Sequence, residues 1–300
     1  MPEASTSARI GPRTVKLTNL DKVLFPGNGF TKAEVVDYYA RMADVLLPHL
    51  RGRALTRKRW PDGTGRQSFF EKNAPRGTPD WVRRVTLPVP GSTKDRETLD
   101  FVVVEETATL VWLANLAALE LHVPQWRVAP DDTVEPPDLL VLDLDPGPPA
   151  GLVECCEVAL AARELVEDEV GQLFAKVSGS KGMQLYAAWP GAQETGLETA
   201  DYARGLAERL ETAMPKLVVS RMTRTLRPRK VFVDWSQNNP AKTTVAPYSL
   251  RGREEPTVSA PVRWDEVASC ADPYDLVFGP ADALERCERL GDLFAALTVA

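Results

Sequence analysis

The chain has 300 residues, of which 44% are hydrophobic and 26% are charged, so it is long and apolar enough to bury a full core. Its 36 Lys and Arg residues against 42 Asp and Glu residues give a formal charge of −6, which argues against coating by nucleic acid through bulk charge but allows local basic patches. Two histidines are too few for a His-rich zinc site, and the four cysteines show no CxxC spacing, which argues against structural zinc or a disulfide framework.

The chain begins with a polar segment that lacks the apolar stretch of a signal peptide, and we expect residues 1–12 to form a flexible tail. No run of about 18 apolar residues occurs, so no membrane span is expected. The first helix is expected to begin after Thr31, where Glu34 completes a capping box, and to end at Pro48.

The rest of the chain alternates between strand and helix patterns. Residues 51–60 are expected to lead from a loop into a strand, and the strands at 85–89 and 99–104 flank a polar tip and are expected to form a hairpin. Further expected strands are 139–145, 173–178, 183–188, 230–235 and 243–247. Expected helices are 109–121, 152–170, 200–214 and 281–297, with loops at 128–137 and 216–230. This alternation predicts a mixed α/β (α+β) fold, and without a dividing linker we expect a single domain over residues 13–300.

Two carboxylates, Asp143 and Asp145, end an apolar strand in the sequence LLVLDLDP. Residues i and i+2 of a strand point to the same face, so these side chains should project together. Their mutual repulsion is relieved by hard divalent cations, for which oxygen ligands are typical. The alternative is a strand-end pair that caps a turn and faces water.

A third carboxylate, Asp234, lies in the apolar strand KVFVDW, in phase with Phe232. Three Asp residues on adjacent strands would form a magnesium or manganese site, and two metals about 4 Å apart can bridge an attacking hydroxyl, a phosphate and a leaving oxygen. Taken alone, Asp234 would be interpreted as an ordinary strand-end Asp.

The segment SGSKG at residues 178–182 follows an apolar strand. Its glycines permit a tight backbone whose N–H groups can face one anion, and Ser178, Ser180 and Lys181 add two hydroxyls and a charge. The pattern is not a Walker A loop, and a plain hairpin turn is the alternative.

Two cationic runs, at residues 51–59 and 216–230, contain no acidic residue, and Arg251 and Arg253 form a third basic group. Unmixed runs favour phosphate partners over solvated faces, in which the signs usually alternate. Phe69 and Phe70 lie in a mostly polar stretch, so at least one could be exposed for stacking on a base.

His122 follows the apolar stretch that we expect to be helical. It is either a satisfied buried histidine or a polar contact to the sugar or base of a ligand.

Several segments, taken together, resemble one known family. In chain order they are TNLDKVLFP, TRKRWP, FFEK, ALELHVPQW, VLDLDPG, SGSKG, KVFVDWSQNN and VAPYSLRGR, from about residue 15 to residue 253. As a set they are similar to the polymerase domain of bacterial ligase D, in the archaeo-eukaryotic primase superfamily. The resemblance implies the primase catalytic core, an RRM-like α/β unit joined to an N-terminal α/β module.

The resemblance implies nucleotidyl transfer, in which a DNA/RNA polymerase adds NTPs or dNTPs to a primer 3′-hydroxyl with two Mn²⁺ or Mg²⁺ ions. It implies that the metal-binding and catalytic residues are Asp143, Asp145 and Asp234. The matching nucleotide-binding positions are Lys58, His122, Ser178, Ser180, Lys181, Gln184, Arg227 and Arg251. Lys22 and Lys32 match lysines that grip a DNA 5′-phosphate, and Phe69 and Phe70 match aromatics that stack against the template.

The partners implied by the resemblance are gapped, overhanging or broken DNA ends, together with Ku and an ATP-dependent DNA ligase in non-homologous end joining. Terminal-transferase and primase activities are further implied possibilities, in a bacterial, cytoplasmic, nucleoid-associated protein without a membrane partner. The sequence carries no ligase or nuclease segment, and Met1 with its polar tail favours a stand-alone enzyme over an excised domain.

One position departs from the family pattern, because Gln184 stands where many members carry the His of SGxKGxH. Glutamine can donate a hydrogen bond but carries no charge, so a catalytically weak DNA-end-binding module is an alternative. A DxD manganese glycosyltransferase is less favoured, since it would need neither a third in-phase Asp nor two cationic runs. A haloacid-dehalogenase-type phosphatase would need a downstream acidic metal motif, which we do not find.

Overall fold

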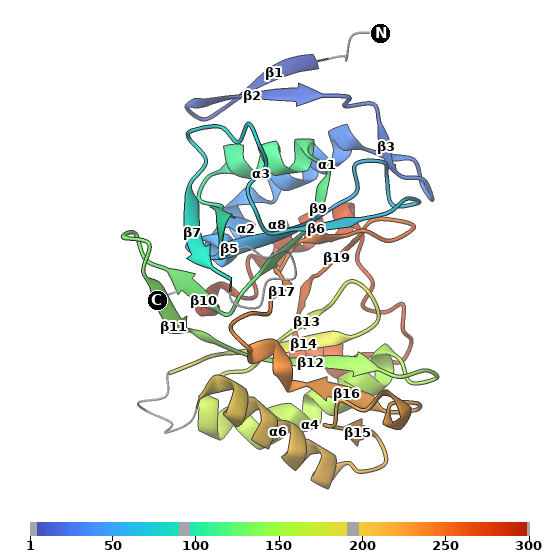
Figure 1. The fold of residues 1–300 in the computed structure, drawn as a ribbon. Coiled ribbons are helices and arrows are strands. Elements are labelled where there is room, and N and C mark those ends of the chain that lie inside the picture. The colour runs from blue at the N-terminus through green and yellow to red at the C-terminus, as the bar shows by residue number, and fades with distance from the viewer. Residues whose placement is uncertain (1–4, 90–96, 191–197, 299–300) are drawn as a thin grey trace.

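Two six-stranded sheets organise the chain, which we describe from a computed structural model over residues 5–89, 97–190 and 198–298 (Figure 1). The first sheet has the order β17 (Thr244–Val245), β9 (Ala118–Val123), β5 (Ala54–Arg59), β8 (Thr98–Val103) and β7 (Arg84–Pro88), with β6 (Phe69–Glu71) also paired to β5. The second sheet has the order β15 (Val218–Val219), β16 (Val231–Asp234), β12 (Leu139–Pro146), β14 (Met183–Ala188), β13 (Phe174–Val177) and β20 (Pro261–Val262).

Helices cover the outer side of each sheet, so the two sheets lie between helical layers (Figure 1). Beside the first sheet lie α1 (Lys32–Arg41), α2 (Ala43–Leu50) and α3 (Thr107–Asn115). The second sheet packs against α4 (Leu152–Val170) and α6 (Thr199–Ala213), while α7 (Trp264–Ser269) packs on α4. None of the helices in the described ranges combines the length and the apolar character that crossing a bilayer requires.

Short elements complete the chain. They are the hairpins β1 (Ser5–Ile10) with β2 (Arg13–Thr18), β3 (Val23–Phe25) with β4 (Phe30–Thr31), β10 (Trp126–Val128) with β11 (Val134–Pro137) and β18 (Leu250–Arg251) with β19 (Thr257–Val258), the helix α8 (Pro280–Leu290), and the 3₁₀ turns η1 (Arg224–Leu226), η2 (Trp235–Asn238) and η3 (Ala295–Leu297).

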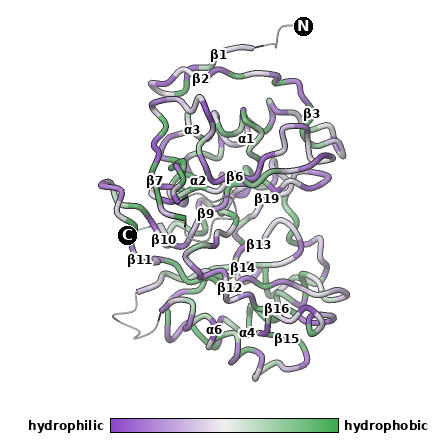
Figure 2. The backbone as a smooth tube through the Cα atoms, viewed as in Figure 1, coloured by the Kyte–Doolittle hydropathy of each residue, from purple (hydrophilic) through white to green (hydrophobic). Residues whose placement is uncertain are grey.

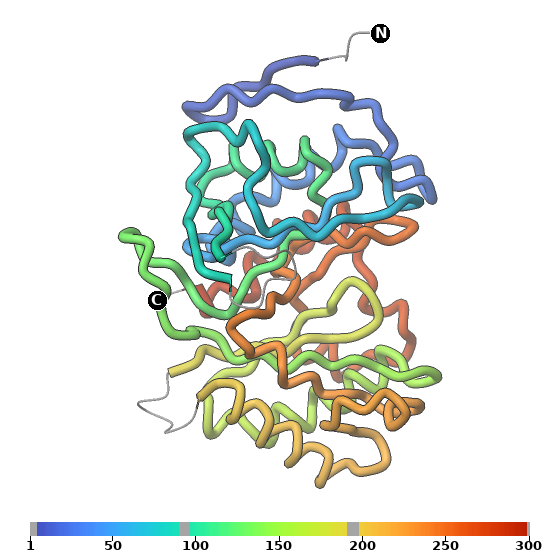
Figure 3. The backbone as a smooth tube through the Cα atoms, in the orientation of Figure 1, coloured from blue at the N-terminus to red at the C-terminus, as the bar shows by residue number. Residues whose placement is uncertain are grey.

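The C-terminal part of the chain returns to the N-terminal half. Figure 3 shows the orange and red segments beneath the blue half, and β17 pairs with β9 while α8 contacts α1. One cluster of buried hydrophobic residues extends from Val15 to Ala283 and includes members of both halves, and hydrophobic stretches occur in both halves in Figure 2. The two sheets therefore share one core.

Most strands and helices that we expected from the sequence are confirmed within a few residues. The mixed α/β fold is confirmed, and so are the capping box of α1 and the hairpin of β7 with β8, although the tip at residues 90–96 lies outside the described residues. The helix at 152–170 and the strand at 183–188 have the expected bounds.

The expected tail is wrong for residues 5–10, which form β1 and pair with β2 in an antiparallel ladder. The turn between these strands contains Gly11 at φ 56°, a left-handed conformation that glycine adopts without a Cβ clash. Backbone pairing orders this segment, whose largely exposed side chains gave no apolar pattern in the sequence.

The expected helix ends at Pro48 and at residue 121 are also wrong. The first helix ends at Arg41, and α2 runs through Pro48 to Leu50 because its apolar side chains are buried. After Asn115 the chain turns through Ala117 at φ 56° and continues as β9. A continuous apolar run does not by itself distinguish one long helix from a short helix and a buried strand.

Toward the C-terminus, the expected helix end at residue 297 is wrong: the last helix ends at Leu290, before Gly291 at φ 69°, and η3 follows. The sequence predicted neither α7 nor the strands β18 to β20.

The expected loop at 128–137 is wrong in part, because it contains β11, the second strand of the β10–β11 hairpin.

Candidate functional site

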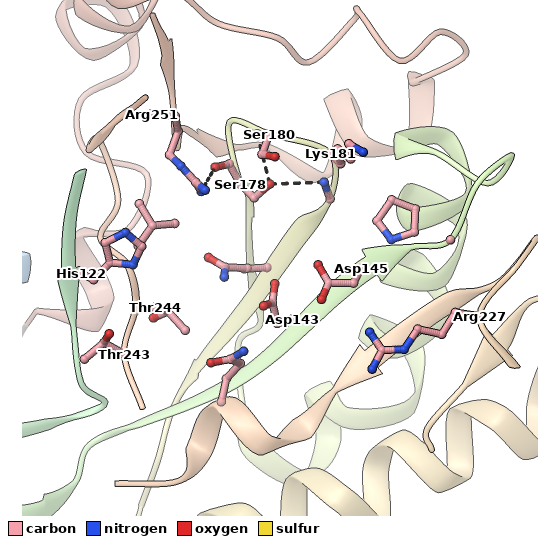
Figure 4. A pocket seen from close by; sticks show the side chains of 16 residues that line it. His122, Asp143, Asp145, Ser178, Ser180, Lys181, Arg227, Thr243, Thr244 and Arg251 are labelled. Carbon is pink, nitrogen blue, oxygen red and sulfur yellow. Dashed lines mark hydrogen bonds between the residues drawn. The ribbon is translucent and has the colours of Figure 1, made fainter. Parts of the chain in front are cut away.

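A cavity of about 420 Å³ lies between the two sheets (Figure 4). The second sheet contributes the end of β12 and Gln184 of β14, and the first sheet contributes His122 of β9 and the start of β17. The cavity lining comprises His122, Asp143, Asp145, Pro146, Gly147, Ser178, Ser180, Lys181, Gly182, Gln184, Arg227, Gln237, Thr243, Thr244, Val245 and Arg251.

Three carboxylates converge beside this cavity: Asp143 and Asp145 line it, and Asp234 lies next to them outside the lining. Asp143 and Asp145 project from the same face of β12, as the spacing of two predicts (Figure 4), and the register of β12 with β16 places Asp234 directly opposite Asp143. One potential ligand atom from each of the three residues lies within 4.8 Å of the others. The structure thus brings together the three acidic residues that the sequence singled out.

Burial and mutual repulsion disfavour the charged forms of Asp143 and Asp145 in this cluster. The pKa of Asp143 is raised to about 7, because burial and the charges of Asp145 and Asp234 together outweigh the lowering effect of Gln184. Burial and the charge of Asp234 also raise the pKa of Asp145. Three oxygen donors that repel one another are a fitting ligand set for a hard divalent cation.

The Asp234 carboxylate is held by its own strand end. Its Oδ1 accepts a hydrogen bond of 3.0 Å from the Ser236 N–H, and its Oδ2 accepts one of 2.9 Å from Gln237 Nε2. The Lys242 ammonium lies 4.0 Å from the same Oδ2. Gln237 and Lys242 were not among the residues predicted from the sequence, although both follow the strand motif within eight positions.

The SGSKG segment forms a tight loop whose backbone is partly used internally. Ser178 Oγ accepts hydrogen bonds from the N–H groups of Ser180, at 3.2 Å, and Gly182, at 3.3 Å. These two N–H groups are therefore used within the loop. The prediction that they would face a bound anion is wrong. Lys181 is exposed and lines the cavity, and a Cβ at Gly182 would lie 2.1 Å from the Leu144 carbonyl oxygen.

Glu120, a buried carboxylate that no motif in the sequence indicated, contacts several cavity residues. Its Oε2 is 2.8 Å from His122 Nε2, and its Oε1 accepts from the Gly252 N–H at 3.0 Å and lies 3.3 Å from Arg251 Nε. Burial by itself would raise the pKa of Glu120, but the His122 hydrogen bond and the Arg251 charge outweigh it and lower the pKa to about 2. Arg251 also donates from Nη1 to the Ser178 carbonyl at 2.6 Å (Figure 4).

The aromatic pair is exposed beside the cavity. Phe69 and Phe70 are 46% and 62% exposed, so both rings are available for stacking, although neither lines the cavity. The Phe70 ring lies 5.6 Å from the His122 ring, and the Lys58 ammonium lies 5.1 Å from the Phe70 centroid. Lys58 is thus at the cavity edge rather than in its lining.

The cationic run at 51–59 is mostly neutralised within the protein, so the expectation of a phosphate-binding run is wrong for three of its arginines. Arg53 pairs with Asp138 at 2.6 Å. Arg57 and Arg59 pair with Glu71 at 2.8 and 2.9 Å. The partner acids lie outside the run, on β6 and just before β12, so the run itself showed an excess of cations that the fold removes.

The second cationic run, at 216–230, remains largely exposed. Its Arg227 lines the cavity, stacks 3.8 Å from the Phe232 ring centroid and donates from Nη2 to the Met222 carbonyl at 3.0 Å. Arg221 pairs with Glu211 at 3.3 Å on the surface.

Lys22 and Lys32 lie close together, away from the cavity lining. The Lys32 N–H donates to the Lys22 carbonyl at 2.8 Å. The Lys22 ammonium is partly exposed and 3.2 Å from Asp62 Oδ1, whereas Lys32 is buried and donates from Nζ to the Thr18 carbonyl at 2.7 Å.

Comparison with known proteins gives a consistent family. Residues 31–294 match the model of the LigD primase-polymerase domain. The chain is 46% identical over 284 residues to the multifunctional non-homologous end joining protein LigD of Mycolicibacterium smegmatis, and 34% identical over 277 residues to the bifunctional LigD of Bacillus subtilis. It aligns over 94% and 92% of its own length but spans only 36% and 43% of these relatives.

A solved structure is similar over nearly the whole chain. The polymerase domain of Mycobacterium tuberculosis ligase D, determined in complex with DNA, superposes with a TM-score of 0.86 at 43% identity. The match covers 95% of this chain and 98% of that domain.

Proposed function

The chain belongs to the LigD primase-polymerase domain family, and from this premise we propose that it is a template-dependent DNA/RNA polymerase. In this proposal it adds NTPs or dNTPs to a primer 3′-hydroxyl at gaps and broken ends. The observation that carries the proposal is the convergence of Asp143, Asp145 and Asp234 beside a cavity lined by Lys181, Arg227 and Arg251.

The three carboxylates are the residues that would hold divalent cations, with Asp143 and Asp145 contributed by β12 and Asp234 by β16. Two Mn²⁺ or Mg²⁺ ions bound there would supply activation of the primer hydroxyl and neutralisation of phosphate charge. The chain's own part is to hold the three carboxylates in place, through backbone register for all of them and through Ser236 and Gln237 for Asp234.

Positive and polar groups around the cavity would bind the nucleotide. Ser178, Ser180 and Lys181 of the SGSKG loop line the cavity together with Arg251, which contacts the Ser178 carbonyl, and a triphosphate there would lie close to cations and hydroxyl groups. Arg227 faces them across the cavity (Figure 4).

The remaining nucleotide contacts would come from the opposite sheet and from the centre of the site. His122 would contact the sugar or base, with Lys58 close by, and Gln184 would act from its place in the lining opposite Asp143.

The exposed Phe69 and Phe70 would stack on the template strand, since aromatic rings bind bases of any sequence. Lys22, which is partly exposed, would contact a DNA 5′-phosphate. The buried Lys32 would support that site by fixing the Thr18 backbone beside it.

The cellular setting that we propose is non-homologous end joining, with Ku and an ATP-dependent DNA ligase as partners. It rests on the names of the relatives, which are end-joining proteins, and on the M. tuberculosis domain, which was solved with DNA. The family match does not favour a glycosyltransferase or a binding module without activity.

The proposal is tested by the double substitution Asp143→Ala with Asp145→Ala. Removing two of the three oxygen ligands should reduce nucleotide incorporation on a labelled gapped duplex by at least about 1,000-fold while DNA binding persists, because the carboxylates act on the reacting groups only. The matched control, Glu157→Ala with Glu208→Ala, removes two exposed acids from the outer helices and should extend the primer as the wild type does. Incorporation by the double Asp variant at the wild-type rate would refute the proposal.

A further inference from the structure

A row of polar side chains crosses the second sheet and ends at the carboxylate cluster. The register pairs Lys176 of β13 with Gln184 of β14, Gln184 with Asp143 of β12, and Asp143 with Asp234 of β16. Residues directly opposite each other on neighbouring strands present their side chains on the same face. Lys176 is therefore linked to the cluster across one intervening side chain.

Lys176 is fully buried, and its ammonium group is committed to specific acceptors. Its Nζ donates to Gln184 Oε1 at 2.5 Å and to Ser259 Oγ at 2.6 Å, and the Ser259 hydroxyl in turn donates to the Val177 carbonyl at 3.1 Å. The Tyr186 ring centroid lies 5.6 Å from the same nitrogen.

The contact with Lys176 determines which way the Gln184 amide points. The two ends of an amide are alike in shape but opposite in polarity, so an amide needs a partner that distinguishes them. With Oε1 bound to Lys176, Nε2 is the end of the Gln184 amide that is left to face Asp143, the residue directly opposite Gln184 on β12. The reversed amide would place an oxygen against a carboxylate.

Burying a lysine here is costly, which makes a filler role a poor explanation. Burial, with the Arg251 charge, moves the pKa of Lys176 well below its usual value. An apolar side chain of similar length would occupy the same space without desolvating an ammonium group.

We propose that Lys176 is a positioning residue, which acts through Gln184 to hold the Asp143 carboxylate in the orientation that binds a divalent cation. The inference rests on the proposed function, since it concerns the same carboxylates. It adds a residue that contacts neither nucleotide nor metal but determines how well the metal site is formed.

The test measures Mn²⁺ binding directly, by the electron paramagnetic resonance signal of free Mn²⁺, in full-length protein without nucleotide or DNA. Lys176→Met keeps the length of the side chain but removes the donor, and it should weaken Mn²⁺ binding about tenfold, the usual scale for a residue that supports a metal ligand. Lys176→Gln restores a donor to Gln184 Oε1, and it should bind Mn²⁺ within about threefold of the wild type.

A second background separates positioning from packing. In Gln184→Leu protein there is no amide to orient, so adding Lys176→Met should weaken Mn²⁺ binding by less than about a further twofold. Folding of each variant is checked by circular dichroism and thermal unfolding. If Lys176→Met does not fold, the comparison uses Lys176→Gln and Gln184→Leu, of which only the second should lose about tenfold in Mn²⁺ affinity.

Three results with the variants would overturn the inference. They are wild-type Mn²⁺ affinity in folded Lys176→Met, an equal loss from Lys176→Met in both backgrounds, and, where that variant does not fold, wild-type affinity in Gln184→Leu. Failure of the wild type to bind Mn²⁺ would overturn it too. If wild type and variants bind Mn²⁺ as expected but the wild type cannot extend a primer, the proposed function is refuted and the role of Lys176 in the metal site still holds.

Discussion

Glu120 connects residues of the site that lie far apart in the sequence. Its carboxylate bonds His122 and the Gly252 N–H and pairs with Arg251, which come from β9 and from the segment around β18. Because it is almost fully buried, its charge is weakly screened and holds these groups firmly. We therefore expect Glu120 to position both His122 and Arg251 for the nucleotide.

The substitution Glu120→Gln keeps the shape of the side chain but removes its charge. We expect the free energy of unfolding at pH 7 to fall by about 2–3 kcal/mol, because Arg251 loses a buried partner. The KM for nucleotide should rise about tenfold with a smaller change in kcat, since the lost contacts orient binding groups. Urea unfolding and steady-state extension measure the two effects.

The pH dependence gives a further check on Glu120. Its pKa is about 2 in the folded protein and 4.5 without the fold, so its stabilising contribution is present above pH 4.5 and is lost as the pH falls toward 2. The stability difference between wild type and Glu120→Gln should therefore shrink over that range. The control Glu135→Gln changes an exposed acid and should leave the free energy of unfolding at pH 7 close to that of the wild type. A constant difference between pH 7 and pH 2.5 for Glu120→Gln would contradict this role.

Residues that share one strand were predictable, and residues that meet through the fold were not. The period of two along β12 predicts that Asp143 and Asp145 project together. Lys176 and Glu120, in contrast, lie in apolar stretches, where nothing in the local pattern distinguishes a network residue from a solvated one. Their partners Ser259 and Arg251 come from segments far along the chain.

At the scale of elements, helices and strands were predicted correctly where the hydrophobic period and the end signals were strong. The capping box of α1 and the uninterrupted helix α4 were predictable from sequence for this reason. The boundary between α3 and β9 was not, because both are apolar and the turn uses Ala117 rather than a glycine or proline. The positive charge of residues 51–59 wrongly predicted a phosphate-binding run for a related reason. The acids that pair with these arginines, Glu71 and Asp138, lie outside the run.

The packing of the SGSKG loop against β12 leads to a prediction about backbone approach. A Cβ at Gly182 would lie 2.1 Å from the Leu144 carbonyl oxygen, so Gly182→Ala should displace the loop from the end of β12. We expect extension activity to fall at least about 100-fold, since a displacement of about 1 Å at a reacting centre has an effect of that size. A labelled primer-extension assay measures it.

The matched control is Gly205→Ala, in the interior of α6. Nothing lies within 4 Å of a Cβ at this position, so the substitution should raise the free energy of unfolding by about 0.5–1 kcal/mol and leave activity unchanged. Gly182→Ala protein with wild-type activity would show that the close approach is not needed.

At the scale of the whole molecule, the chain folds back so that its last third completes both halves. Tyr38 of α1 donates to the Tyr248 carbonyl at 2.7 Å, and His49 of α2 lies 2.9 Å from Asp292. With the shared core, these contacts lead us to propose that residues 5–298 form one domain, which extends the domain expected from the sequence to include β1. The site exists only in this assembled form, because each sheet supplies one wall of the cavity.

The central claim is that this cavity transfers nucleotides to a primer end with the help of divalent cations. The most direct measurement is extension of a labelled gapped duplex by the wild-type protein with each NTP and dNTP, in the presence of Mn²⁺, Mg²⁺ or a chelator. We predict template-directed addition with Mn²⁺ or Mg²⁺ and none with the chelator. Binding of the duplex without extension under any of the metal conditions would contradict the account and identify a DNA-end-binding protein instead.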